Sequence, residues 1–126
     1  MTTAAESRKF RAYRFRQAVA ALVMLETDLP TYRKPEPGSR LSEMVKEALP
    51  ASDIQGIPGV LLNCRTEKVR DLSTAVDEAR AEAAREGLPY YAVCWSRPAR
   101  DLGEAFVVTD LECFSALLAE REKARA

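Results

Sequence analysis

Residues 52–65 read SDIQGIPGVLLNCR, and this stretch decides how the rest of the chain is arranged. The GIPG sequence at 56–59 predicts a tight turn, because glycine accepts positive φ values and proline favours turn positions. The apolar run that begins at Val60 predicts a strand buried on both faces. Side chains alternate along a strand, so Asn63 and Arg65 are expected to lie on the same face.

The segments on either side predict helices that alternate with short strands. The helix over 71–86 has a narrow stripe of small side chains, which permits close packing against a sheet. Thr109 and Glu112 form a T-x-x-E box that is expected to cap a final helix. Together these segments predict an α/β fold, in which helices flank a small mixed sheet. The expected order is a helix at 7–27, short β segments at 31–34 and 53–54 with a helix at 39–49 between them, a buried strand at 60–65, a helix at 71–86, strands at 90–95 and 105–108, and a helix from 109.

The chain has 126 residues, which is the usual size of a single domain. That domain is expected over 7–119, with a disordered tail at 1–6 and a charged, frayed tail at 120–126. Hydrophobic residues make up 47% of the sequence and charged residues 30%, so an ordinary globular core is expected. Basic and acidic residues are equal in number, at 19 each, so a nucleic-acid partner would require a local basic patch.

The absence of histidine excludes Ser-His-Asp catalysis, Cys-His catalysis and histidine-ligated zinc. The cysteines, Cys64, Cys94 and Cys113, are widely spaced and odd in number. Buried thiols in a reducing cytoplasm are therefore expected, rather than disulfides or a zinc site. No apolar run approaches the ~20 residues of a membrane span, and no signal-peptide pattern follows the first charges. A cytoplasmic protein without a membrane partner is expected.

Basic residues crowd the first turns of the helix expected at 7–27. Cations at a helix N-terminus oppose the helix dipole, at ~0.3–1 kcal/mol each, and two interpretations of this charge are open. One interpretation is a phosphate-facing patch, in which Phe10, Tyr13 and Phe15 lie between the cations. The other is a solvated helix end whose charge is balanced by acidic side chains in the fold. The expected nucleic-acid or phosphate ligands are Arg8, Lys9, Arg11, Arg14, Arg65, Lys68, Arg97 and Arg100.

Three segments together resemble a known family. DIQGIPGVLLNCR at 53–65, YYAVCWSRPAR at 90–100 and AFVVTDLECFSALL at 105–118 are similar to the small PD-(D/E)XK nucleases of actinobacterial phages, which are often described as resolvase-like. The resemblance extends over about residues 10–118, and its most specific part is 53–60. It implies a restriction-endonuclease-like core, a phage or prophage protein in the cytoplasm of a bacterial host, and a possible homodimer.

In that family an aspartate and a glutamate hold Mg²⁺, and a lysine two residues after the glutamate positions water. The aspartate position matches Asp53, but the glutamate position is Asn63 and the lysine position is Arg65. A glutamate of the first helix aligns near Arg16. Arginine stays protonated and cannot act as a base, and guanidinium groups beside one carboxylate repel a metal ion. The resemblance therefore implies that these four catalytic positions no longer bind Mg²⁺ or catalyse cleavage.

Three functions stay open at this point. The first is a catalytically inactive nuclease-fold protein, without a cofactor, that is retained to bind nucleic acid or a host protein. The second is an active Mg²⁺-dependent endonuclease in which Asp53 binds the metal with displaced partners. Glu67 and Lys68 are the candidate partners, although Glu67 would lie about 13 Å from Asn63 if the strand continued for four more residues. The third is a modulator of a host factor with no nucleic-acid role. It would bind its partner through aromatic side chains of the 90–95 strand if these are exposed. The alternative is that these side chains lie in the sheet core.

Overall fold

The computed structural model describes residues 3–34 and 51–126, so the helix expected at 39–49 lies outside the described residues. The described part contains three α-helices, a five-stranded sheet and one 3₁₀ turn. Their bounds are α1 Ala4–Thr27, β1 Tyr32–Arg33, β2 Ile54–Gln55, β3 Val60–Arg65, α3 Leu72–Glu86, β4 Tyr90–Trp95, η1 Leu102–Glu104, β5 Phe106–Val108 and α4 Leu111–Arg125.

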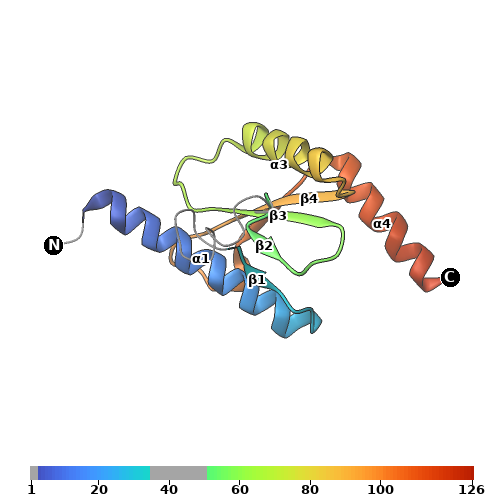
Figure 1. Ribbon diagram of the computed structural model, residues 1–126, viewed down its shortest axis with the longest axis horizontal. Helices are drawn as coiled ribbons and strands as arrows, with labels where there is room; N and C mark the ends of the chain where they lie inside the picture. The colour runs from blue at the N-terminus through green and yellow to red at the C-terminus, as the bar shows by residue number, and fades with distance from the viewer. Residues whose placement is uncertain (1–2, 35–50) are drawn as a thin grey trace.

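The five strands form one mixed sheet in the order β1-β2-β3-β4-β5. Antiparallel pairing joins β1 to β2 and β2 to β3, while β3 and β4 are parallel and β5 is antiparallel to β4. The parallel pair requires a crossover connection, which α3 supplies. Helix α1 covers one face of the sheet and α3 the other, whereas α4 extends away from the sheet (Figure 1). The predicted fold, a small mixed sheet flanked by helices, is confirmed.

The sheet separates two apolar clusters. Leu61 and Leu62 are both buried and belong to different clusters, so β3 is buried on both faces as predicted. The cluster on the α1 side contains Val19, Ala20, Ile54, Leu62, Cys64 and Cys94. The cluster on the α3 side contains Leu61, Ala75, Val76, Ala79, Ala83, Tyr91, Val93, Trp95 and Cys113. Alanine at three inward positions of α3 allows the helix to lie close to β3 and β4.

Both end helices extend into segments that were expected to be tails. Helix α1 begins at Ala4, because the Thr3 hydroxyl accepts from the Glu6 N–H while the Glu6 carboxylate accepts from the Thr3 N–H. This capping box satisfies two of the N–H groups that a helix start leaves without partners. Helix α4 continues to Arg125, with ion pairs between charged side chains one to three residues apart.

The start of α4 differs from the T-x-x-E prediction. Asp110, not Thr109, is the N-cap, and its carboxylate accepts the Cys113 N–H at 2.9 Å. The Thr109 hydroxyl donates instead to the Tyr91 carbonyl of β4 at 2.6 Å. A tertiary contact therefore moves the helix start by one residue.

Burial of the apolar side chains differs between β4 and α1. Tyr91 and Trp95 are buried, which confirms the sheet-core interpretation for these two, and Tyr90 is half-buried against the same cluster. In α1 only Val19 and Ala20 are buried, and Phe10 is 59% exposed. In the part of the chain that the structure describes, no helix is long and apolar enough to cross a membrane.

Candidate functional site

Asp53 is held by contacts from two sides. Its Oδ2 accepts a hydrogen bond from the Cys64 N–H at 2.9 Å, and its Oδ1 lies 3.6 Å from the Lys34 ammonium. The same ammonium donates to the Ala51 carbonyl at 3.1 Å. The Asp53 side chain is 17% exposed, so these contacts occupy most of its accessible surroundings. Asp53 thus ties the segment after β1 to the backbone of β3.

Asn63 and Arg65 lie on the same face of β3, as alternation predicts, and both contact α3. Asn63 Oδ1 accepts the Asp53 N–H at 3.1 Å, and its Nδ2 donates to Glu82 at 3.0 Å. The Arg65 guanidinium pairs with Glu78 at 2.7 Å and with Glu67 at 3.2 Å. Glu67 therefore binds Arg65, and this contact does not support its role as a displaced partner of Asp53.

Arg16 and Asp53 both act electrostatically on Cys64, which faces α1. Burial raises the pKa of the Cys64 thiol far above its ordinary value, and the neighbouring Cys94 and the Asp53 charge raise it further. The Arg16 guanidinium opposes these effects and lowers that pKa. Cys94 is also buried, and burial raises its pKa to about 11. Both thiols therefore stay protonated at neutral pH and are unreactive core residues.

The described residues at this place do not fit a divalent cation. Mg²⁺ requires several oxygen ligands, usually with one or two carboxylates free to bind it. Here both oxygens of Asp53 already face donors, and the Asn63 oxygen accepts a backbone hydrogen bond. Within residues 3–34 and 51–126, no three His, Cys, Asp or Glu side chains are grouped so that they could hold a metal ion.

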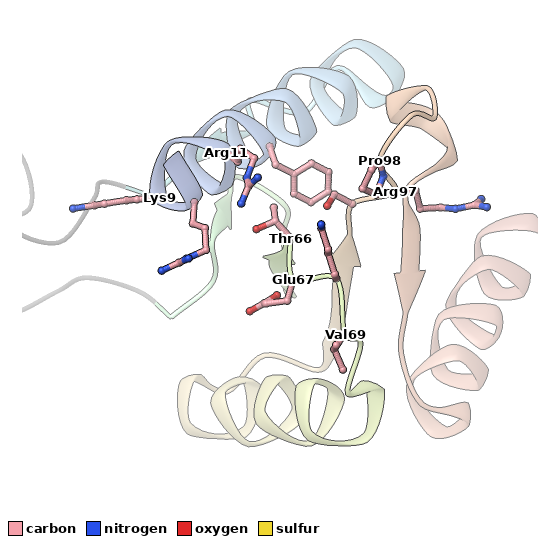
Figure 2. Close-up of a pocket in the computed structure, with 11 residues that line it drawn as sticks. Lys9, Arg11, Thr66, Glu67, Val69, Arg97 and Pro98 are labelled. Atoms are coloured by element: carbon pink, nitrogen blue, oxygen red, sulfur yellow. The ribbon is translucent and has the colours of Figure 1, made fainter. Parts of the chain in front are cut away.

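A basic groove of about 990 Å³ lies beside the end of β3. Three segments that are distant in the sequence line it: the first turns of α1, the loop between β3 and α3, and the loop after β4. Figure 2 shows that Arg11 projects from α1 above Thr66 and Glu67, while Lys9 and Arg97 extend outward at opposite ends. The lining residues are Arg8, Lys9, Arg11, Phe15, Thr66, Glu67, Lys68, Val69, Ser96, Arg97 and Pro98.

The charge of the groove is strongly positive. Five lining residues are basic and one, Glu67, is acidic, which leaves a formal charge of +4 from five positive and one negative side chain. Arg65 pairs with Glu67, so the one acid is already engaged. No ion pair within the described residues engages the cations of Arg8, Lys9, Arg11 or Lys68, and all four side chains are exposed.

Arg97 is held in place on the far side of the groove. Its guanidinium lies 4.2 Å from the centroid of the Phe106 ring and donates to the Glu104 carbonyl at 3.3 Å. Arg70 also lies over Phe106, at 5.4 Å, and donates to the Ser96 carbonyl. These contacts fix the loop after β4 next to β5, so that one edge of the groove is preorganised.

The structure brings five of the eight predicted phosphate ligands together in this groove: Arg8, Lys9, Arg11, Lys68 and Arg97. The other three have different contacts. Arg14 lies 5.7 Å from the Phe10 ring centroid, and Arg100 pairs with Glu104 at 3.3 Å. Arg65 pairs with two acids and lies 5.9 Å from the Trp95 ring centroid. None of these three lines the groove.

Sequence reasoning missed the partners of Asp53, Asn63 and Arg65. Lys34, Glu78 and Glu82 were not candidate site residues, yet they hold Asp53, Arg65 and Asn63. The four-residue spacing of Glu78 and Glu82 was the available signal, because it places both carboxylates on one face of α3. Nothing in the sequence indicates that Lys34 returns to Asp53.

Comparisons with protein-family models, curated proteins and solved structures give no match to this chain. A proposal for the function therefore rests on the fold and the side-chain geometry alone.

Proposed function

We propose that the chain binds nucleic acid along the basic groove and does not cut it. The observation that supports binding is the convergence of five cations from three separate segments on one groove. Phosphate groups are the ligands that arginine and lysine clusters select, and released counterions drive such binding. Lys9 and Arg97 lie at opposite ends of the groove, so a bound backbone would meet cations at both ends (Figure 2).

The second half of the proposal is that the Asp53 site is inactive. Its support is the engagement of Asp53 by Lys34 and the Cys64 N–H, together with the contacts of Arg65 to Glu67 and Glu78. The chain resembles the PD-(D/E)XK nucleases of actinobacterial phages, and descent from such a nuclease would explain a nuclease-like layout that lacks the metal ligands. On this proposal the protein acts in the cytoplasm of a bacterial host and requires no Mg²⁺.

Binding is tested by fluorescence anisotropy with labelled duplex DNA, single-stranded DNA and RNA over a series of salt concentrations. If four or five cations contact phosphates, the slope of log K against log salt for duplex DNA should be about −4. Affinity should then fall by on the order of 100-fold between 50 and 200 mM salt. Replacing Arg8, Arg11 and Lys68 by alanine should reduce the slope by about one per lost contact.

Arg85→Ala is the matched control, because Arg85 is an exposed cation in the last turn of α3, away from the groove. The control should leave both affinity and slope unchanged. No binding at low salt to any of the three ligands would rule out the nucleic-acid proposal and leave a host protein as the partner. An equal loss of affinity in Arg85→Ala and the groove variant would show that binding is not localised to the groove.

Cleavage is tested separately, with linear and branched DNA in the presence of Mg²⁺ or Mn²⁺. The expected result is intact DNA in every lane. Cleavage that disappears in Asp53→Ala would overturn the inactive-site half of the proposal and would support the displaced-partner endonuclease. Binding and cleavage are read independently, so either half can fail alone.

A further inference from the structure

Helix α4 is attached to the rest of the described structure through its first turn. Of its 15 residues, only Cys113 is buried, beneath Tyr91 of β4. Two further links are ion pairs from Arg80 of α3 to Asp110 and Glu112, at 3.2 and 2.8 Å. The later turns extend away from the sheet (Figure 1). Isolated helices of this length are marginal in water, so a packing partner along α4 would account for its stability.

The exposed part of α4 has an apolar stripe. Residues three, four and seven apart share one side of a helix, which places Leu111, Phe114, Leu117 and Leu118 in a row. Their exposed fractions range from 37% to 78%. The row continues onto β5, the edge strand of the sheet, where Val107 is 65% exposed. A hollow of about 360 Å³ joins the two, with Val107, Leu111 and Phe114 in its lining.

We infer that this surface is the interface of a symmetric homodimer in which α4 packs antiparallel against α4 of a second copy. The area of the patch supports a second copy as the occupant. Taking ~200 Å² for a fully exposed large apolar residue, the five side chains expose on the order of 500 Å². A standard interface buries ~800 Å² per partner, and homodimer interfaces are about 65% apolar, which corresponds to roughly 520 Å².

The charge pattern supports the antiparallel direction. Arg121 and Arg125 extend the stripe at its C-terminal end, while Asp110 lies at its N-terminal end. A two-fold axis between Leu117 and Leu118 brings Arg121 level with Phe114 of the other copy, and Arg125 level with Asp110. The first pairing places a guanidinium near an aromatic ring. The second brings Arg125 toward Asp110, which already binds Tyr91 and Arg80, so it adds only a weak attraction between opposite charges. Antiparallel helix dipoles also attract one another, whereas parallel ones repel.

The dimer is tested by analytical ultracentrifugation of the full chain between about 1 and 100 µM, the weaker end of the affinity range for interfaces of this size. The expected result is a species of twice the chain mass. Phe114→Glu should weaken association by about 100-fold, the loss typical of a central aromatic residue. Leu25→Glu is the control, because Leu25 is an exposed apolar residue on α1, 76% exposed against 50% for Phe114, and this variant should still dimerise. A wild-type chain that stays monomeric throughout would overturn the inference.

Cross-linking tests the direction without disturbing the fold. The native cysteines are buried, so a short thiol-reactive linker should act on an added surface cysteine alone. In the antiparallel dimer, residue 117 lies about 1.5 Å along the helix axis from its copy, and residue 111 about 20 Å. Leu117→Cys should therefore cross-link and Leu111→Cys should not. The opposite result would exclude this packing. Since α4 is remote from the groove residues, the dimer and nucleic-acid binding can fail independently.

Discussion

Replacing Asp110 should detach the start of α4 from the sheet. Its carboxylate caps the helix through the Cys113 N–H at 2.9 Å. The same carboxylate accepts the Tyr91 hydroxyl, with 2.7 and 2.6 Å to its two oxygens, and pairs with Arg80 at 3.2 Å. One side chain thus joins β4, α3 and α4, so Asp110→Ala removes three contacts at once.

The cost can be assigned contact by contact. Loss of an N-cap typically costs ~1 kcal/mol of unfolding free energy. The Tyr91 hydroxyl would lose its acceptor at a partly buried position, which costs ~1–2 kcal/mol. The Arg80 pair is half exposed and screened by water, so it contributes little. Asp110→Ala should therefore lower the free energy of unfolding by about 2–3 kcal/mol. Asp110→Asn keeps an acceptor oxygen for the cap and the hydroxyl, and should cost ~0.5–1 kcal/mol.

Urea denaturation of the three proteins measures these differences at pH 7, and repetition at lower pH tests their cause. The Tyr91 hydroxyl first, then the Cys113 N–H and Arg80, hold the pKa of Asp110 below its ordinary value. The charged carboxylate therefore stabilises the fold above its unfolded pKa of ~3.9, and this contribution is lost as the pH falls through the lower folded pKa. The gap between wild type and Asp110→Asn should close below about pH 4.

Two outcomes would refute this reasoning. Equal, small losses for the alanine and asparagine variants would show that neither the cap nor the Tyr91 hydrogen bond matters. A second test is the Tyr91→Phe and Asp110→Ala double-mutant cycle, in which the coupling energy should be ~1 kcal/mol. A coupling near zero would show that the hydroxyl and the carboxylate do not interact in solution.

Two further changes test the turn before β3 and the contact of β3 with α3. Gly56 has a φ of +93° and an added Cβ would overlap the Pro30 carbonyl, so Gly56→Ala should lower the free energy of unfolding by more than ~2 kcal/mol. Gly87 has a φ of +69° but open space around it, so Gly87→Ala is the control and should lower it by ~1 kcal/mol, as measured by thermal or urea unfolding. Asn63→Glu places a carboxylate against Glu82, where the amide now donates at 3.0 Å, and should cost ~1–2 kcal/mol at pH 7. Asn63→Gln is the neutral control, and a loss in the glutamate variant that persists at pH 4 would contradict the repulsion.

The central part of the fold was predictable because local signals and packing agree there. The predicted helix at 71–86 matches α3, since Asp71 caps its start and Gly87 ends it with a φ of +69°. The predicted strands at 60–65 and 90–95 match β3 and β4, whose apolar side chains fill both faces of the sheet. The α4 cap was wrong by one residue, because both Thr109 and Asp110 are good caps and a contact with β4 decides between them.

The groove could be predicted only in part. The sequence marks the basic residues but does not say which of them meet, since the lining comes from three segments up to about 90 residues apart. Within α1, each step of three residues turns a side chain by about 60° around the axis, so Arg8 and Arg11 line the groove while Arg14 turns to Phe10. Such convergence depends on tertiary structure, which neither composition nor periodicity records.

The contacts of Asn63 and Arg65 explain why these residue types suit β3. Side chains two apart on a strand are separated by ~6.6 Å, and side chains four apart on a helix by ~6.0 Å. Asn63 and Arg65 therefore match Glu82 and Glu78 of α3, which runs back along the strand. Each pair requires a donor on the strand, and an amide and a guanidinium supply it. A glutamate at 63 would face Glu82 with a like charge. The amide at 63 and the guanidinium at 65 thus serve the docking of α3 against β3.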